Sequence, residues 1–136
     1  LAVDYPYYAS VTELAAAVDF LLIAVGGGES TYHLIDAGVL DALGSQGILI
    51  NVGRGSVVDE AALAQALAEG RLLGAGLDVF EDEPRPHAGL LDLDNVLLAP
   101  HMASATWDTR RAMSDLTLAN LAAHFSDAAY PTPIPD

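Results

Sequence analysis

Residues 47–78, GILINVGRGSVVDEAALAQALAEGRLLGAGLD, contain the unit that decides the fold. The mostly apolar run Gly47–Asn51 is typical of a buried strand, and Leu72–Asp78 is a second run of the same kind. Between these two runs, Asp59 is placed to cap a helix over Glu60–Glu69. A strand, a helix and another strand at this spacing predict a parallel βαβ unit.

The same alternation continues on both sides of this unit. Two further strands are predicted over Phe20–Val25 and Asn95–Ala99, the first of them apolar enough to be buried on both faces. Flanking helices are expected over residues 10–18, 34–43 and 106–125. The chain is therefore predicted to be α/β with a parallel sheet.

In open sheets of this kind, ligands bind beyond the carboxyl ends of the strands. Those ends are Val25–Gly26, Asn51–Gly55, Asp78–Glu83 and Pro100–Thr106. We therefore searched these four segments for side chains that support chemistry.

Composition excludes several classes of partner. With 136 residues, 52% of them hydrophobic, the chain is long enough for one domain with a core. Five arginines and no lysine oppose nineteen acidic residues, and a net charge of −14 disfavours nucleic acid and anionic membranes. The absence of cysteine fits a reducing compartment. We expect a soluble cytoplasmic protein with no nucleic-acid or membrane partner.

Taken one at a time, the candidate residues are ambiguous. Arg54 lies between Gly53 and Gly55 directly after a strand, where a planar fork of donors suits a carboxylate, but a surface arginine in a turn would look the same. Asp78 and Glu83 belong to an acidic segment of the kind that is often merely solvated. No pair of the four histidines has metal-ligand spacing, so no metal is predicted.

The dinucleotide fingerprint G-x-G-x-x-G is missing from this chain. Gly26-Gly27-Gly28 follows a strand, but Thr31 stands where the third glycine is required. Three glycines at a strand end usually form only a turn. Alternatively, a backbone without side chains lets a flat adenine ring approach closely.

Taken together, three segments resemble the D-isomer-specific 2-hydroxyacid dehydrogenases in order and spacing. They are INVGRGSVVDE (residues 50–60), GAGLDVFEDEP (74–84) and NVLLAPH (95–101), the last followed by Ser104-Ala-Thr106. The resemblance extends from about Tyr7 to the C-terminus. Two departures are Val25-Gly26-Gly27, in a stretch that often contains proline, and Met102-Ala103, where Ile-Gly is common.

The resemblance implies a role for each matched residue. Arg54, Glu83 and His101 match that family's catalytic residues. Arg54 would bind the substrate carboxylate and polarise the carbonyl, His101 would donate a proton, and Glu83 would favour the imidazolium. Residues expected near the cofactor, which is NAD or NADP, are Val25, Gly26, Val52, Gly53, Arg54, Asp78, His101 and Ser104.

The resemblance also implies the architecture of a longer protein. Residues 1–125 would form part of a Rossmann-like, doubly wound NAD(P)-binding domain whose first βα unit is missing. Residues 126–136 would return toward a substrate domain that is also missing. The expected substrate is a small 2-oxo or 2-hydroxy acid, and Tyr5–Ser10 and the proline-rich tail favour the glyoxylate and hydroxypyruvate reductase branch. A homodimer is expected.

Two other interpretations remain open. The C-terminal-binding corepressors resemble the same dehydrogenases and share similar motifs, so the chain could instead belong to a nucleotide-sensing scaffold. A third interpretation is that the chain by itself is only a dimerising half-domain. Turnover of glyoxylate or hydroxypyruvate by the full-length protein separates an enzyme from a scaffold, and light scattering tests for dimers.

Overall fold

The computed structural model describes residues 4–134. The chain forms two compact units, the first ending at His101 and the second beginning at Met102. Each unit is described by itself. The predicted boundary after residue 125 falls inside the second unit, and residues 1–3 and 135–136 of the two predicted segments lie outside the described residues.

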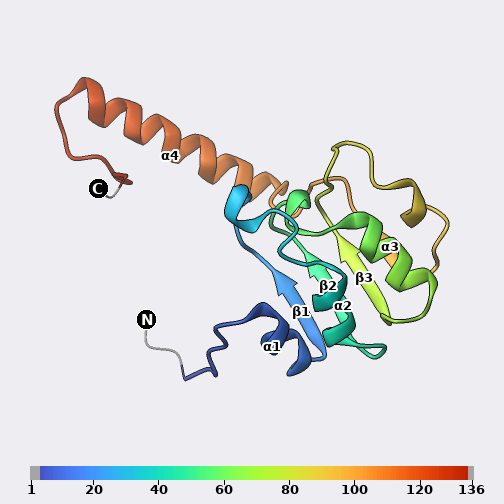
Figure 1. Cartoon of the computed structure of the whole chain (residues 1–136). Helices are drawn as coiled ribbons and strands as arrows, with labels where there is room; N and C mark the ends of the chain where they lie inside the picture. Colours follow the sequence, from blue (N-terminus) through green and yellow to red (C-terminus); the bar gives the residue numbers. More distant parts are fainter. Residues whose placement is uncertain (1–3, 135–136) are drawn as a thin grey trace. The chain divides into compact units, whose positions relative to one another are not determined.

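The first unit contains a four-stranded parallel sheet in the order β1-β2-β3-β4. The strands are β1 (Phe20–Ile23), β2 (Ile48–Asn51), β3 (Gly74–Leu77) and β4 (Val96–Leu98). All four strands were predicted, and every neighbouring pair is parallel, with Phe20 opposite Ile48 and Ile48 opposite Gly74. The predicted α/β class and parallel sheet are confirmed (Figure 1).

One short helix precedes β1, and further short helices and turns connect the strands of this sheet. They are α1 (Val11–Ala16), α2 (Ala37–Leu43) and α3 (Glu60–Ala68), with 3-10 turns η1 (Glu29–Thr31), η2 (Gly55–Val57) and η3 (Ala88–Leu90). Each α-helix begins at a side-chain cap, which is Ser10, Asp36 or Asp59. The second helix starts three residues later than predicted, because Asp36 caps it by accepting a hydrogen bond from the amide of Val39.

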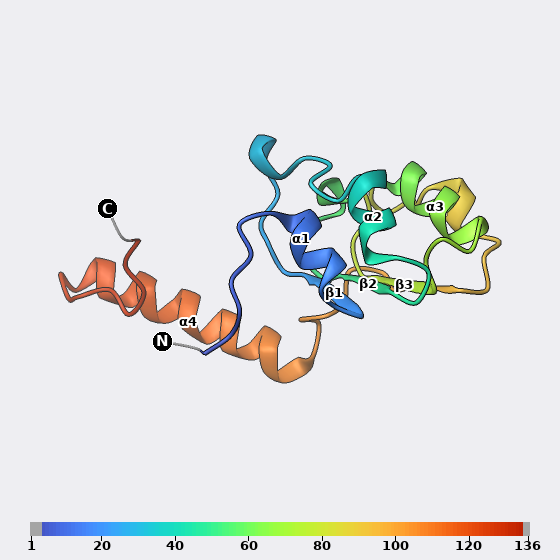
Figure 2. The ribbon, with the colours of Figure 1, turned by 60° about the horizontal axis from the view of Figure 1, so that its bottom comes forward.

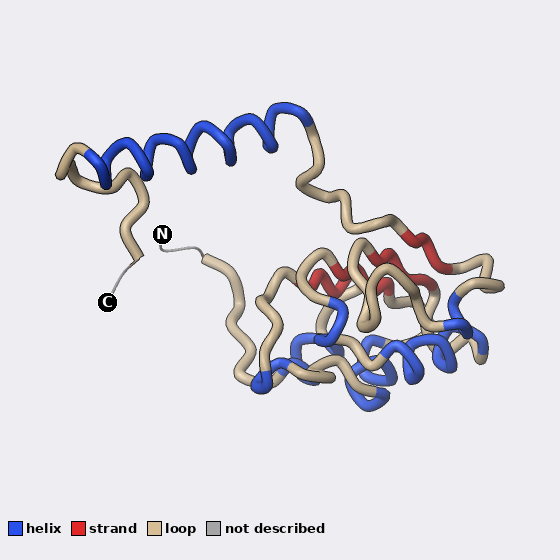
Figure 3. The backbone as a smooth tube through the Cα atoms, turned by 90° about the horizontal axis from the view of Figure 1, so that it is seen from above, coloured by secondary structure: helices blue, strands red, loops and turns tan. Residues whose placement is uncertain are grey.

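Within the first unit the helices cover one face of the sheet (Figures 2 and 3). Leu49 and Leu77 point into that layer and are almost fully buried. On the opposite face Phe20 is 64% exposed and Leu22 is 60% exposed. The prediction that β1 is buried on both faces is therefore wrong for this unit, because only alternate residues of each strand meet the helices.

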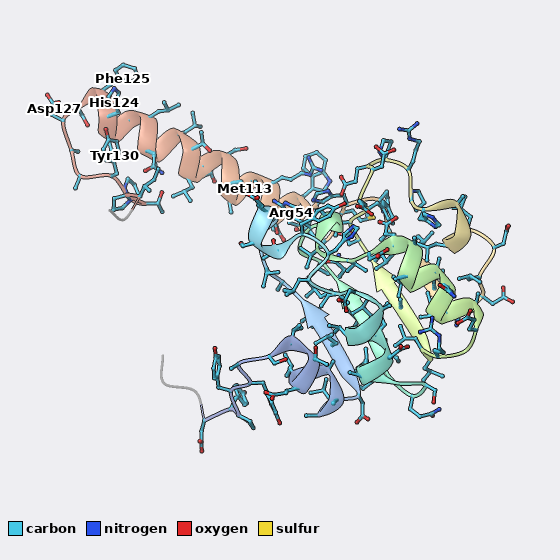
Figure 4. All side chains as sticks on the ribbon, in the orientation of Figure 1. Arg54, Met113, His124, Phe125, Asp127 and Tyr130 are labelled. Atoms are coloured by element: carbon cyan, nitrogen blue, oxygen red, sulfur yellow. The ribbon has the colours of Figure 1, made fainter. Side chains whose placement is uncertain are left out.

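The second unit consists of the turn that begins at Met102, α4 (Trp107–Phe125) and the segment that follows α4. Thr106 caps the helix by accepting a hydrogen bond from the amide of Thr109. Beyond the helix, the hydroxyl of Tyr130 lies 2.8 Å from Nδ1 of His124, so the tail folds back on its own helix (Figure 4). No helix in residues 4–134 combines the length and apolar character that crossing a bilayer requires.

Candidate functional site

Four loops meet at the carboxyl edge of the sheet. Because the strands are parallel and adjacent in chain order, the segments that follow β1, β2, β3 and β4 emerge side by side. Arg54 lies beyond the end of β2 at this edge (Figure 4). The edge is therefore where the predicted site residues of the first unit gather.

The loop after β2 is shaped by a buried asparagine. Asn51 is 1% exposed, its amide nitrogen donates to the carbonyl of Arg54 at 3.0 Å, and its amide oxygen accepts from the amide of Gly53 at 3.0 Å. One side chain thus forms hydrogen bonds with two backbone groups of the turn, a carbonyl and an amide. Asn51 was not predicted as a site residue, although a polar residue at the end of an apolar strand is a visible signal.

The two glycines beside Arg54 are required by close packing. A Cβ at Gly55 would lie 1.9 Å from the carbonyl carbon of Phe80, and one at Gly53 would lie 2.6 Å from the carbonyl oxygen of Val25. Any side chain at either position would therefore collide with the backbone of a neighbouring loop. The two glycines let the loops after β1, β2 and β3 approach one another, which fixes the backbone of Arg54.

Glu83 and His101 form a direct pair. The Nδ1 atom of His101 lies 2.8 Å and 3.0 Å from the two carboxylate oxygens of Glu83. The amide of Phe80 also donates to Glu83 at 3.3 Å. His101 has a φ of 51°, in the left-handed region that non-glycine residues rarely adopt. Such a conformation outside glycine is typical of functional positions.

The electrostatics of this pair favour a charged carboxylate. The hydrogen bond from His101 lowers the pKa of Glu83, the bond from the Phe80 amide lowers it further, and nearby Arg54 acts in the same direction. Partial desolvation opposes these effects but does not reverse them. Glu83 therefore stays ionised next to the imidazole ring.

An open groove of about 440 Å³ brings the three predicted catalytic residues together. Its lining is Gly27, Gly28, Arg54, Gly55, Ser56, Phe80, Glu81, Glu83 and His101. A smaller hollow of about 110 Å³ adjoins the pair and is lined by Phe80, Glu83, Pro84, Pro100 and His101. A guanidinium, a carboxylate and an imidazole thus face one solvent-accessible space that can admit a small acid.

A buried acidic residue, Glu60, stabilises the loop that carries Glu83. Glu60 is 3% exposed and accepts hydrogen bonds from the amides of Glu81 at 2.7 Å and His87 at 2.8 Å. These charge-assisted bonds connect the first turn of α3 to the loop after β3. Glu60 was not predicted as a site residue, because its sequence position indicates only the first turn of a helix.

His33, in the loop after β1, was not predicted as a site residue but contacts several groups near the site. Its Nε2 atom lies 2.7 Å from Glu81, its ring stacks on Tyr32 at 3.9 Å, and its Nδ1 atom lies 3.9 Å from Asp59. Only the tertiary structure brings these groups together. Within residues 4–134, no three or more histidine, cysteine or acidic side chains are arranged to hold a metal ion.

The predicted cofactor residues of the first unit lie at the same edge of the sheet. Val25 and Val52 are 43% and 40% exposed, and nothing lies within 4 Å of the position that a Cβ on Gly26 would take. Asp78 is buried at the end of β3, and its amide donates to the carbonyl of Asn51 at 3.0 Å. Exposed apolar side chains beside uncovered glycine backbone fit a flat, partly apolar group such as a nucleotide.

Ser104, the remaining predicted residue, belongs to the second unit, in the turn before α4. It is exposed there. Its role near a cofactor stays a prediction, as do the roles of the other residues predicted for the site.

The sequence of this chain is similar to a known family and to several known proteins. Residues 2–103 match the family model described as D-isomer specific 2-hydroxyacid dehydrogenase, NAD binding domain. The chain is 52% identical over 132 residues to glyoxylate/hydroxypyruvate reductase A of Arabidopsis thaliana, covering 97% of this chain and 42% of that protein. It is also 52% identical to hydroxyphenylpyruvate reductase of Plectranthus scutellarioides, covering 96% of this chain and 42% of the relative.

A solved structure is similarly close. The NADPH-dependent glyoxylate/hydroxypyruvate reductase of Sinorhizobium meliloti, in complex with NADP and malonate, superposes with a TM-score of 0.92 at 52% identity. The match covers 97% of this chain and 41% of that one. The chain thus spans about two fifths of the length of the relatives it matches.

Proposed function

Since its residues 2–103 match the family's NAD-binding domain, this chain belongs to the D-isomer-specific 2-hydroxyacid dehydrogenases, and we propose that it is part of a longer reductase of small 2-oxo acids. The single observation that carries the proposal is the Glu83–His101 pair on the same groove as Arg54. Relatives named as glyoxylate and hydroxypyruvate reductases support a short 2-oxo acid as substrate.

Arg54 binds the substrate carboxylate and polarises the neighbouring carbonyl. One of its terminal nitrogens, Nη1, donates to the carbonyl of Gly53 at 2.7 Å, which holds the planar group while other donors remain available. Charge on the carbonyl oxygen grows as the reaction proceeds, so this contact strengthens in the transition state.

His101 donates the proton that the carbonyl oxygen needs. Its Nδ1 atom is engaged by Glu83, which directs the other ring nitrogen, Nε2, away from the carboxylate. The negative charge of Glu83 stabilises the protonated ring before transfer. The pair thus holds a proton at Nε2 and releases it to the alkoxide.

The cofactor in this proposal is NAD or NADP. A bound reduced nicotinamide supplies the hydride that adds to C2 of the oxo acid. Val25, Gly26, Val52 and Gly53 would hold it along the strand ends, with Asp78 and Ser104 also contributing. The structure of a relative solved with NADP favours the phosphorylated form.

The test is turnover by the full-length protein. Glyoxylate and hydroxypyruvate are each added with NADPH, and separately with NADH, and loss of reduced-nicotinamide absorbance is followed. We expect measurable reduction of at least one oxo acid. A protein that binds the nucleotide but shows almost no turnover would contradict the proposal and support the scaffold interpretation.

We further propose a homodimeric, cytoplasmic protein, and a domain arrangement in which residues 1–125 belong to the cofactor domain and the tail returns to a substrate domain. The similarity to a dehydrogenase NAD-binding domain supports the domain arrangement, and the absence of cysteine fits a reducing compartment. Light scattering of the full-length protein tests the dimer, and cell fractionation tests the location.

A further inference from the structure

His33 connects two of the three loops that carry the proposed catalytic residues, the Arg54 loop and the Glu83 loop. Its backbone amide donates to the carbonyl of Ser56 at 2.8 Å, two residues beyond Arg54. Its side chain reaches Glu81 at 2.7 Å, two residues before Glu83. A single residue in the loop after β1 is therefore bonded to the loop after β2 through its backbone and to the loop after β3 through its ring.

Two further hydrogen bonds, besides the one from His33, hold Glu81 in place. Its amide donates to the buried carboxylate of Glu60 at 2.7 Å, and the hydroxyl of Tyr32 donates to the same Glu81 oxygen that His33 contacts, at 3.1 Å. This hydrogen bond to Glu81 raises the pKa of Tyr32, so the hydroxyl remains a donor at neutral pH. Two donors from consecutive residues thus converge on one carboxylate oxygen.

The contact is maintained at a conformational cost. His33 has a φ of 49°, a left-handed conformation that residues with a Cβ rarely adopt. The ring is only 29% exposed, stacks on Tyr32, and has Asp59 3.9 Å from its other nitrogen. Because a carboxylate can only accept, the contact at 2.7 Å requires Nε2–H on His33.

We propose that His33 is a positioning residue for the Glu83–His101 pair. By bonding to Ser56 and Glu81, it sets the separation between the Arg54 loop and the Glu83 loop, and so the placement of proton donor against substrate carboxylate. This inference rests on the proposed reductase function. His33 itself contacts no reacting atom in this assignment.

The test compares two substitutions in the full-length protein. His33→Leu removes the donor, and we expect kcat for oxo-acid reduction to fall roughly tenfold through misplacement of the acid, with KM for NADPH unchanged. His33→Gln keeps an N–H at a similar reach and should retain kcat within about threefold. Leucine and glutamine are both unbranched at Cβ, so the backbone strain is similar in the two variants.

Two further readouts separate positioning from a general structural role. In His33→Leu, the descending limb of the kcat–pH profile should move to lower pH, because a displaced Glu83 stabilises the protonated ring of His101 less. Hydrogen–deuterium exchange should rise in residues 78–87, which include the bonded amides of Phe80, Glu81 and His87, and not in β2 or α2.

Matched controls complete the design. Asp82→Asn removes a charge from the same loop but breaks only an exposed ion pair with Arg85, so it should leave all three readouts unchanged. Combining His33→Leu with Glu81→Leu should cost little more than Glu81→Leu alone, because Glu81→Leu already removes the carboxylate that His33 contacts.

The outcomes distinguish the two proposals. An unchanged exchange rate in residues 78–87, an unmoved pH limb or additive effects in the double variant would overturn the positioning role of His33. If the parent protein itself reduces no oxo acid, the reductase proposal fails, and the exchange measurement still decides whether His33 holds the loop.

Discussion

If Arg54 binds the substrate carboxylate, even a conservative substitution should impair the reaction. In the full-length protein, Arg54→Lys should lower kcat/KM for the oxo acid by roughly 10²-fold or more. Lysine keeps the charge but loses the planar fork, and with it the orientation of the substrate carboxylate. Steady-state kinetics measure this effect.

The control for Arg54→Lys is Arg85→Lys. Arg85 is 78% exposed and contacts only the equally exposed Asp82 among the ion pairs of the described residues. That control should keep parental kinetics. If Arg54→Lys also stays within about threefold of the parent, Arg54 is a turn residue and the substrate site is assigned wrongly.

The pH dependence of oxo-acid reduction tests whether the charge of Glu83 acts on His101. Because its pKa is lowered, this carboxylate is ionised through the neutral range and loses its charge only as the pH falls through that lowered value. Its stabilisation of the His101 imidazolium is therefore present in the assay range. Glu83→Gln removes the charge but keeps the shape, so the descending limb of oxo-acid reduction should move to lower pH.

Two comparisons accompany the Glu83→Gln profile. His101→Ala should lower the rate severely and leave NADPH binding, followed by fluorescence titration, nearly intact. Asp82→Asn should leave the limb in place. If the descending limb of the pH profile stays in place in Glu83→Gln, Glu83 is a solvated acidic residue of this loop and not a catalytic residue.

At the scale of the elements, the loops beyond the strands depend on backbone packing. Gly55→Ala would place a Cβ 1.9 Å from the carbonyl carbon of Phe80, and the backbone on both sides would have to move. We expect the free energy of unfolding of the full-length protein to fall by about 3 kcal/mol or more, measured by urea denaturation.

Gly26→Ala is the matched substitution. No atom lies within 4 Å of its added Cβ, so stability should change by less than about 0.5 kcal/mol. Equal stabilities of the two variants would show that the loops after β2 and β3 separate easily. The close approach at Gly55 would then not be what positions Arg54.

The strands and helices were largely predictable, whereas the loops between them were not. Apolar runs and capping residues such as Asp59 carry local information about where an element begins, and all four strands were found from it. The start of α2 lies three residues later than predicted, because the Asp36 side chain caps the helix there. The closeness of Gly55 and Phe80 has no local signature, since the two residues are 25 positions apart.

At the scale of the whole molecule, this chain alone should not catalyse hydride transfer. It contains no G-x-G-x-x-G turn, the element that binds a dinucleotide pyrophosphate at a helix N-terminus, and it spans 41–42% of the relatives' lengths. The purified 136-residue chain and the full-length protein should be assayed side by side with NADPH and glyoxylate. Turnover by the isolated chain, with purity controlled, would refute the expectation.

The sequence by itself determined the α/β class, the parallel strands and the family. It also indicated Arg54, Glu83 and His101 as candidate catalytic residues. Those conclusions depend on apolar periodicity, caps and motif spacing, all of which are local or are read along the chain. Only the tertiary structure decided that Glu60 supports the Glu83 loop and that His33 joins this loop to the Arg54 loop. These contacts join segments that are far apart in the sequence. Packing and hydrogen bonding in three dimensions fix the distance between such segments, and no run of neighbouring residues encodes that distance.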